Sequence, residues 1–376
     1  MTQKKAIKIA LVHDYLCGVG GSERVFQHIC ETFPDADIYT LAYREKLTLP
    51  YFSKKEIKTS IMNRFISSMN AFRLFFPIAT YAMSHIDFKD YDLIISSSAS
   101  VAKYINKKSA IHICYCYYPT RAIWETNKFF KKLSFKKIIF SFLLSYFKKR
   151  DLDASRKVDQ FISISKYTKK RVKEIYKRDS VVINSPIDLK RIQEFKSTNT
   201  TIAKNTYLVV SRLEKWKGID TVIKAFNLNK EQLIVVGDGA ERDYLQSIAN
   251  SNILFLGCVT DKKLYSLYLS SKAIVFPTYL EYGLVPIEAC AFGKVSICID
   301  SPGVRETMIP YDRNNQFTSI FYDNNDPLRV NEAITKLNDV QPDHDFLSKH
   351  AQKYSEEAFC NSLKEFVINY NANKNV

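Results

Sequence analysis

Two cations in the second half of the sequence have the residue types and spacing to bind a diphosphate. Arg212 and Lys217 stand five residues apart in the segment YLVVSRLEKWKGID, between an apolar stretch and an amphipathic one. Arginine can bond two phosphate oxygens at once and lysine acts as a point charge, so the pair would also stabilise the charge on a departing diphosphate. Taken alone, however, they are better explained as surface residues of a lysine-rich chain.

Residues 273–291, AIVFPTYLEYGLVPIEACA, add a glycine turn and an acid to these cations. The pattern predicts a strand, a loop containing Gly283, and a helix that carries Glu288. Such a junction directs unpaired N–H groups and the positive end of the helix at an anion, typically a phosphate. Glu288 could then accept hydrogen bonds from a pair of sugar hydroxyls. An ordinary turn with a solvated glutamate is the alternative for this stretch alone.

A second glycine-rich turn follows the first apolar stretch, residues 8–12. Glycines at 18, 20 and 21 precede an amphipathic segment, and they would let the backbone pass close to a ligand. Position 23 is glutamate, so the turn is not the dinucleotide fingerprint GxGxxG. We expect a loop that faces a ligand, with a simple tight turn as the alternative.

These motifs are positioned by strands that alternate with helices, which is typical of parallel sheets covered on both faces. The polar segment 196–205 predicts a linker between two lobes. We expect an N-terminal Rossmann-like lobe at 1–195, onto which a C-terminal helix at 355–372 packs, and a C-terminal Rossmann-like lobe at 196–354. Two doubly wound lobes would bind a ligand in a cleft at the carboxyl ends of their strands. The expected strands span residues 8–12, 36–41, 91–96, 110–117, 160–165, 181–183, 207–210, 232–236, 253–256, 273–276 and 295–299.

Length and composition indicate a folded protein of a reducing compartment. The chain has 376 residues, 46% of them hydrophobic, which is enough for two cores. Its eight cysteines include no CxxC pair, which argues against zinc and against a disulfide framework. The basic, then apolar, start carries His13 and Asp14 and is interpreted as a buried strand, not as a signal peptide. The sequence contains no run of 18 apolar residues, so it predicts no transmembrane span.

The formal net charge of +16 predicts an anionic partner. Residues 127–150 contain eight lysines and arginines and no acid, interleaved with Phe, Leu and Ile, and residues 61–76 are similar in character. This composition favours contact with an anionic membrane surface. A solvated helix face is the main alternative, and nucleic acid is disfavoured because no recognition fold for it is evident.

Together, the motifs resemble the family 4 glycosyltransferases, which are retaining enzymes with the GT-B fold. In the second half the resemblance rests on Arg212, Lys217, the VGDG sequence at 236–239, the FP pair at 276–277 and GLVPIEA with Glu288. The first-half motifs look most like those of bacterial mannosyltransferases of O-antigen and capsule assembly. They are GGSER at 20–24, SSS at 96–98, HICYCYYPTRAIWE at 112–125, ISISKYT at 162–168 and PID at 186–188.

The resemblance implies a role for each site residue. Glu288 would bind the ribose hydroxyls of a nucleoside diphosphate sugar, and Gly20 and Gly21 would lie under its sugar and diphosphate. The phosphates would be bound by the side chains of Arg212 and Lys217. They would also accept hydrogen bonds from the backbone N–H groups of Gly283, Leu284 and Val285. No metal or other cofactor is implied, because the positive loop and the helix dipole would take the place of a metal.

Two positions depart from the family's pattern. The first of the family's two acids, eight residues before Glu288, is Leu280 here, and the nearest acid is Glu281. That acid usually contacts the transferred sugar, so we expect Glu281 to take its role. Tyr117 stands where relatives often carry a histidine, and tyrosine can form hydrogen bonds but cannot titrate near neutral pH.

Three other polar residues belong to the strands that lead to the expected site. His13 and Asp14 end the first strand and would face the cleft by position. Asp14 could act on the acceptor side or could be a loop cap. By alternation along its strand, His112 is interpreted as a strand histidine whose hydrogen bonds are satisfied.

The expected function is transfer of a hexose, with retention, from a nucleoside diphosphate sugar to a lipid-linked saccharide in bacterial surface polysaccharide biosynthesis. GDP-mannose is the first choice of donor, and the protein is expected in the cytoplasm at the inner face of the plasma membrane. The alternatives are a UDP-sugar-using transferase, a catalytically impaired partner that binds a nucleotide sugar or glycan in an assembly complex, and a sugar-nucleotide epimerase of the same architecture.

Overall fold

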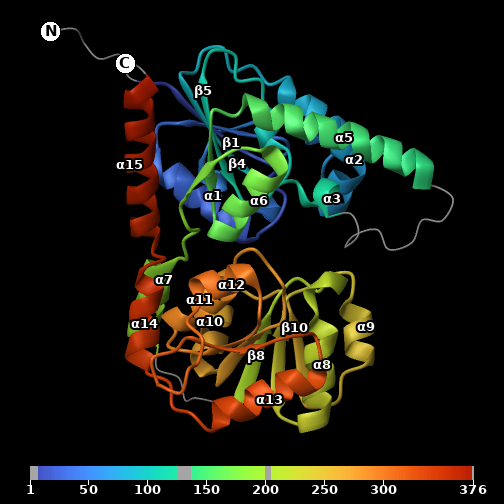
Figure 1. Ribbon diagram of the computed structural model, residues 1–376, viewed down its shortest axis with the longest axis vertical. Helices are drawn as coiled ribbons and strands as arrows, with labels where there is room; N and C mark the ends of the chain where they lie inside the picture. The colour runs from blue at the N-terminus through green and yellow to red at the C-terminus, as the bar shows by residue number, and fades with distance from the viewer. Residues whose placement is uncertain (1–6, 126–136, 200–204, 375–376) are drawn as a thin grey trace. The chain divides into compact units, whose positions relative to one another are not determined.

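The computed structural model describes residues 7–125, 137–199 and 205–374. The chain divides into two compact units, the first made of Met1–Ser185 with Phe359–Val376 and the second of Pro186–Ala358 (Figure 1). The boundary expected after residue 195 falls within helix α7 (Leu189–Thr198). The expected C-terminal helix is α15 (Glu356–Lys374), and its residues from Phe359 onward belong to the first unit.

The first unit is built on a parallel sheet with the strand order β3-β2-β1-β4-β5-β6-β7 among the described residues. The order reverses between the neighbours β1 and β4, which pair in register from Ile9 with Leu93 to His13 with Ser97. The loops after these two strands therefore leave the same edge side by side. The strand bounds are β1 Ile9–His13, β2 Asp37–Thr40, β3 Ile57–Thr59, β4 Leu93–Ser98, β5 Ile111–Cys116, β6 Gln160–Ser163 and β7 Ser180–Val182.

Helices cover both faces of this sheet. On one face, α2 and α5 enclose a core that includes Ala10, Val12 and Ile94. On the other face, α15 packs its Phe359 ring against Tyr115 of β5, with centroids 5.6 Å apart. The helix bounds are α1 Gly21–Thr32, α2 Met69–Ser84, α3 Arg121–Trp124, α5 Lys137–Lys157 and α6 Lys166–Tyr176, with 3-10 turns η1 Glu45–Leu47, η2 Phe52–Lys54, η3 Ile61–Arg64 and η4 Ala102–Tyr104.

A buried ion pair fixes the segment that follows β5. Asp151 of α5 accepts hydrogen bonds from Lys103 Nζ at 2.9 Å and from Tyr104 Oη, Trp124 Nε1 and Tyr176 Oη, each at 2.7 Å. Burial alone would raise the pKa of Asp151, but the charge of Lys103 and the donated hydrogen bonds outweigh it and lower this pKa. Because the donors come from η4, α3 and α6, one carboxylate holds three elements to α5.

The second unit repeats the architecture with the strand order β10-β9-β8-β11-β12-β13, again all parallel. Helices α8 and α9 cover one face and α10 and α11 the other (Figure 1). The strands are β8 Thr206–Val210, β9 Gln232–Val236, β10 Ile253–Gly257, β11 Ala273–Phe276, β12 Ser296–Ile299 and β13 Ser319–Tyr322. The helical elements are η5 Lys215–Lys217, α8 Ile219–Asn229, α9 Arg242–Ser247, α10 Asp261–Ser270, α11 Leu284–Ala291, α12 Pro302–Thr307, α13 Pro327–Asn338 and α14 His344–Gln352.

The prediction of two doubly wound lobes is confirmed. Two strands that we did not expect, β3 and β13, lie at the edges of the sheets. Residues 200–204 of the expected linker lie outside the described residues. All eight cysteines are free, and six of them are buried.

Candidate functional site

The loops that carry the predicted donor-site residues of the second unit start from neighbouring strands. β8 pairs with β11 at the point where the strand order reverses, so both loops begin at the carboxyl edge of the sheet. Thr278 Oγ1 donates to the carbonyl oxygen of Lys217 at 3.2 Å. A Cβ atom on Gly218, whose φ is +70°, would lie 3.1 Å from the carbonyl oxygen of Pro277. The structure thus brings the Lys217 loop against the loop that leads to Gly283.

The two cations of the β8 loop differ in how they are held. Lys217 is buried, and its Nζ lies 4.2 Å from the centroid of the Trp216 ring. Arg212 is exposed at the start of the same loop. Gly237 has a φ of +126°, and a Cβ atom there would lie 1.9 Å from the carbonyl oxygen of Ser211. The loop after β9 therefore contacts the backbone beside Arg212, an approach that only glycine permits.

Helix α11 begins at the predicted turn. Gly283 is its N-cap, Leu284 and Val285 are its first residues, and its first turn contains no acid. N–H groups in the first turn of a helix have no acceptor within the helix, and the dipole makes this end positive. The geometry provides the arrangement of donors that an anion needs. That these N–H groups bind donor phosphates stays a prediction.

Glu288 lies in the second turn of α11 and is only partly buried. Tyr268 of α10 donates a hydrogen bond from its Oη to Glu288 Oε2 at 2.8 Å. The Tyr268 ring is fully buried and stacks on Phe292, with centroids 5.1 Å apart and planes at 2°. Tyr268 therefore fixes one carboxylate oxygen of Glu288. Sequence reasoning missed this tyrosine, because the spacing of 20 residues carries no periodic signal.

The loop that carries Glu281 is packed against α12. A Cβ atom on Gly303 would lie 2.0 Å from the carbonyl carbon of Glu281 and 2.1 Å from its oxygen. Gly303 thus lets the Glu281 backbone contact the start of α12. The Glu281 side chain is half-buried, and its role at a transferred sugar stays a prediction.

In the first unit, the glycine-rich turn starts helix α1. Gly20 is the N-cap and Gly21 the first residue of the helix. Their predicted place under a donor sugar is not tested by this geometry. Asp14 is buried, and its carboxylate accepts hydrogen bonds from the N–H groups of Ala99, Val101 and Ala102 at 2.6–2.7 Å. It is the loop cap that we considered as one alternative, and its predicted role toward an acceptor stays a prediction.

Tyr117 follows β5 and is buried. Its Oη donates to the carbonyl oxygen of Ser22 at 3.0 Å and lies 2.9 Å from Ser97 Oγ. Burial raises the pKa of Tyr117 well above the usual value, so the side chain is a neutral phenol at physiological pH. His112 Nε2 lies 2.8 Å from Ser96 Oγ, and burial lowers the pKa of this histidine to about 3. Its Nδ1 is buried without a hydrogen-bond partner, so the expectation of a fully satisfied strand histidine is wrong for this nitrogen.

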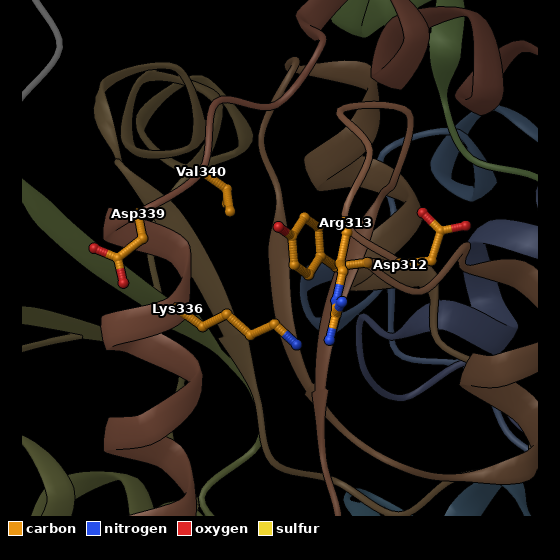
Figure 2. Close-up of a pocket in the computed structure, with 6 residues that line it drawn as sticks. Asp312, Arg313, Lys336, Asp339 and Val340 are labelled. Atoms are coloured by element: carbon orange, nitrogen blue, oxygen red, sulfur yellow. The ribbon is translucent and has the colours of Figure 1, made fainter.

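Among the residues that the structure describes, no group of three or more His, Cys, Asp or Glu could hold a metal ion. A surface hollow lies away from these loops, between the segment before β13 and the end of α13 (Figure 2). In it, Lys336 Nζ lies 4.8 Å from the centroid of the Tyr311 ring, and Arg313 has a φ of +78°. The hollow contains none of the predicted site residues, and its lining residues are Tyr311, Asp312, Arg313, Lys336, Asp339 and Val340.

Two doubly wound parallel sheets, with candidate binding loops at their order reversals, define the GT-B fold class. The solved structure described as Anabaena Alr3699/HepE in complex with UDP is similar to this chain with a TM-score of 0.68 and 16% sequence identity. The match covers 96% of this chain and 100% of that one. At this identity the likeness shows the fold.

Residues 190–358 match the model of the family Glycosyl transferases group 1. The resemblance to family 4 glycosyltransferases that the sequence motifs indicate is thereby confirmed. The matched residues coincide with almost all of the second unit, which carries Arg212, Lys217 and Glu288.

Three curated proteins are similar to longer or shorter parts of the chain. The uncharacterized glycosyltransferase MJ1069 of Methanocaldococcus jannaschii is 26% identical over 245 residues, which are 59% of this chain and 61% of that protein. The alpha-1,3/1,6-mannosyltransferase ALG2 of Saccharomyces cerevisiae is 23% identical over 376 residues, 83% of this chain and 73% of that one. The O-antigen chain mannosyltransferase C of Escherichia coli is 26% identical over 176 residues, which are 39% of this chain and 47% of that protein.

Proposed function

We propose that the protein is a retaining glycosyltransferase that moves a hexose from a nucleoside diphosphate sugar to a lipid-linked saccharide. The observation that supports this most is the arrangement in the group 1 domain, where the Lys217 loop contacts the loop that leads to α11 and Glu288. Cations, free helix N–H groups and a fixed carboxylate are the groups that a diphosphate and a ribose require.

In this proposal the leaving diphosphate is stabilised by Arg212, Lys217 and the start of α11. Charge that develops on the departing oxygen would meet groups already in place, which lowers the barrier. The acceptor would attack from the face that the diphosphate leaves, with a donor oxygen as base and no metal ion. Tyr117 would serve as a neutral hydrogen-bonding group, because a phenol with a raised pKa cannot act as a base at neutral pH.

Mannose from GDP-mannose is the first choice of donor, because two of the similar proteins are described as mannosyltransferases. The description of one of these as an O-antigen enzyme also favours a role in bacterial surface polysaccharide biosynthesis. A UDP-sugar is the second candidate, because the solved structure with the same fold is described as a complex with UDP.

A thermal-shift panel tests the donor site. It would use GDP, UDP, GDP-mannose, UDP-glucose and UDP-N-acetylglucosamine with the wild type and Glu288→Ala, and Glu332→Ala on the exposed face of α13 as the control. We expect one class of nucleotide to raise the unfolding temperature of wild type and control, and Glu288→Ala to abolish the shift. If none of these ligands shifts the wild type, the donor-site assignment is wrong.

A catalytically impaired partner of an assembly complex remains the rival reading, supported by Leu280 and Tyr117 at the two departing positions. Donor hydrolysis by the purified protein separates the two. Slow release of nucleoside diphosphate, lost in Lys217→Gln but kept in Lys215→Gln, supports the transferase. Binding of the donor without any release would support the impaired partner. Release of an epimer with no acceptor present would support the epimerase.

We also propose that the first unit contacts an anionic membrane surface, where a lipid-linked acceptor would be found. Several large apolar side chains on η3, α2 and α5, and on the residue that follows η3, are exposed. In chain order they are Ile61, Phe65, Ile78, Tyr81, Leu143 and Tyr146. The Phe76 and Phe147 rings lie 5.9 Å apart and join α2 to α5. Exposed aromatic and aliphatic groups beside basic ones suit a headgroup layer. Residues 127–136, part of the predicted membrane segment, lie outside the described residues.

A further inference from the structure

Five residues at the carboxyl edge of the first unit's sheet form a closed polar ring: His13, Ser22, Glu23, Ser97 and Tyr117. Tyr117 Oη contacts both the Ser22 carbonyl oxygen and Ser97 Oγ, and Ser97 Oγ lies 3.0 Å from His13 Nδ1. His13 Nε2 lies 3.9 Å from Glu23 Oε1, and Ser22 Oγ donates to Glu23 Oε2 at 3.0 Å. The ring joins β1, α1, β4 and the residue after β5.

The titratable members of the polar ring are all buried: His13 is 2% exposed, Glu23 6% and Tyr117 9%. The ring lies directly beside the glycine-rich turn. A Cβ atom on Gly20 would lie 2.7 Å from Glu23 Oε2, so the carboxylate contacts the turn and leaves no room for a side chain there. Glu23 is the third residue of α1, and the geometry of the first helical turn brings its carboxylate back to the glycine-rich turn.

The directions of the hydrogen bonds from Tyr117 to His13 follow from the Ser22 carbonyl oxygen, which can accept but cannot donate. The Ser22 carbonyl oxygen can only accept, so the Tyr117 hydroxyl proton points to it. Ser97 Oγ must then donate to Tyr117 Oη. Because that proton is committed, Ser97 accepts from His13, whose Nδ1 must carry a hydrogen.

Glu23 lies at the other nitrogen of His13, Nε2. Burial alone would raise the pKa of Glu23, but the hydrogen bond and charge of His13, a backbone N–H and Ser22 outweigh it and lower the pKa. The Glu23 carboxylate faces the Nε2 edge of the His13 ring, while Ser97 binds its Nδ1, so the imidazole is held from both sides. The Phe26 ring stacks on His13 with centroids 4.6 Å apart, and the carboxylate of the adjacent Asp14 accepts backbone N–H groups. Neither competes with Glu23 for Nε2.

We propose that Glu23 and His13 are positioning residues for sugar transfer. They form a buried carboxylate–imidazole pair that fixes the Gly20–Gly21 turn and the Tyr117 hydroxyl in one arrangement. The proposal rests on the proposed function, in which this turn lies under the donor sugar. Loss of the pair would leave the nucleotide-binding groups of the second unit intact and would misplace the groups that face the sugar. Small misplacements of this kind lower turnover strongly.

The first experiment does not depend on any activity. The full-length protein, with nitrogen-15 in its histidine rings, would be studied by NMR at pH 7.5, and the His13 signals would be assigned with His13→Gln. We expect Nδ1 of His13 to carry a hydrogen in the wild type and to donate it to Ser97 Oγ. A wild-type ring whose single hydrogen lies on Nε2 overturns the proposal, because the order of hydrogen bonds from Tyr117 through Ser97 to His13 would then be wrong.

The second experiment separates positioning from stability. We expect Glu23→Gln to lower the turnover number for donor cleavage by about ten- to a hundredfold and to change the dissociation constant of the nucleoside diphosphate by less than about twofold. Glu31→Gln is the control, because it changes another histidine–glutamate contact of α1, between the buried His28 Nδ1 and Oε2 of the exposed Glu31 at 2.8 Å. It should leave both quantities unchanged.

Three outcomes are informative. Equal losses in Glu23→Gln and Glu31→Gln would show a general effect on α1 and overturn the proposal. If Glu23→Gln does not fold, Tyr117→Phe removes one hydroxyl of the ring and should give the same split between turnover and nucleotide binding; equal turnover in this variant and the wild type counts against the proposal. A wild type without donor turnover would contradict the proposed function, while the NMR result would still decide the state of the pair.

Discussion

Glu288 and Lys217 are each held by an aromatic neighbour in the second unit. Tyr268 bonds one oxygen of Glu288, and the Trp216 ring lies 4.2 Å from the Lys217 ammonium. A flexible side chain loses rotamer freedom when a ligand fixes it, so a group already held by its neighbours loses less on binding. Both residues are therefore oriented before a ligand arrives.

Tyr268→Phe should weaken nucleoside diphosphate binding without abolishing it. The variant keeps the ring stacked on Phe292 and removes the hydrogen bond to Glu288. One such bond is worth about 1 kcal/mol, or roughly fivefold in affinity. Isothermal calorimetry would measure the change, with Tyr244→Phe on the exposed face of α9 as the control. Equal affinities for Tyr268→Phe and wild type would show that Glu288 does not depend on this bond.

His112 should make the protein sensitive to acid. Burial lowers its pKa from 6.5 to about 3, so between these values the unfolded chain binds a proton that the folded chain does not. The stabilisation is complete above pH 6.5 and falls as the pH drops toward 3, by up to about 1.4 kcal/mol per pH unit. Urea unfolding at pH 7, 6 and 5 would compare wild type with His112→Gln. As the pH falls, we expect the free energy of unfolding of the wild type to decrease more than that of His112→Gln. An equal decrease in both proteins would contradict this account.

Two glycines determine how closely the loops of the second unit approach one another. Gly237 lets the β9 loop contact the backbone beside Arg212, and Gly303 lets α12 contact the backbone of Glu281. Neither glycine has a side chain that could contact a ligand. The positions of Arg212 and Glu281 thus depend on packing between loops that follow different strands.

Gly303→Ala should displace the Glu281 loop. The added Cβ would lie 2.0 Å from the carbonyl carbon of Glu281, and backbone atoms can relieve this only by moving. We expect a loss of about 1–3 kcal/mol in the free energy of unfolding, measured in urea. The control is Gly18→Ala, whose Cβ would meet no atom within 4 Å. Equal stabilities of the two variants would show that the α12 contact can adjust without cost.

Periodicity predicted most strands but missed the short edge strands. β3 has three residues, none of them fully buried, and β13 has four, so neither gives a long apolar run. Residues 189–198 form α7 where we placed the end of a lobe and the start of a linker. Its N-cap residue, Asp188, forms no side-chain cap bond. The N–H groups of Leu189 and Lys190 instead donate to Glu356, which lies 167 and 166 residues away in the sequence.

The candidate site was predictable where residue type alone signals chemistry, as for Arg212, Lys217 and Glu288. Its supporting residues were not. Tyr268, Ser97 and Gly303 act through partners on other elements, and only the packed structure shows which residues meet. Asp14 illustrates the same limit, since a buried acid at a strand end could equally be a ligand-facing group or a loop cap.

At the scale of the whole molecule, the net charge of +16 accompanies exposed apolar groups on the first unit. None of the described helices is both long and apolar enough to cross a bilayer. Basic residues near an anionic surface contribute about 1 kcal/mol each, and salt weakens this attraction. Any attraction to a membrane surface should therefore depend strongly on ionic strength.

Flotation with anionic liposomes tests this contact. We expect the wild type to float with the vesicles at low salt, and a variant with four lysines changed to glutamate to remain in the dense fraction. The changed residues are Lys131, Lys132, Lys136 and Lys137. A control with the same change in charge on the second unit should still float; its residues are Lys230, Lys262, Lys263 and Lys336. Unchanged flotation of the first variant would show that this segment does not bind the membrane.

The first unit is completed by residues that lie beyond the whole second unit in the sequence. Phe359 packs on Tyr115, and Cys360 Sγ donates to the carbonyl oxygen of His28 at 3.6 Å. During synthesis, residues 186–358 form one continuous stretch and can fold as soon as they leave the ribosome. The nascent first unit must wait, with Tyr115 and the end of α1 uncovered, until residues 359–374 have been made. The unit that is translated first is therefore the one that finishes folding last.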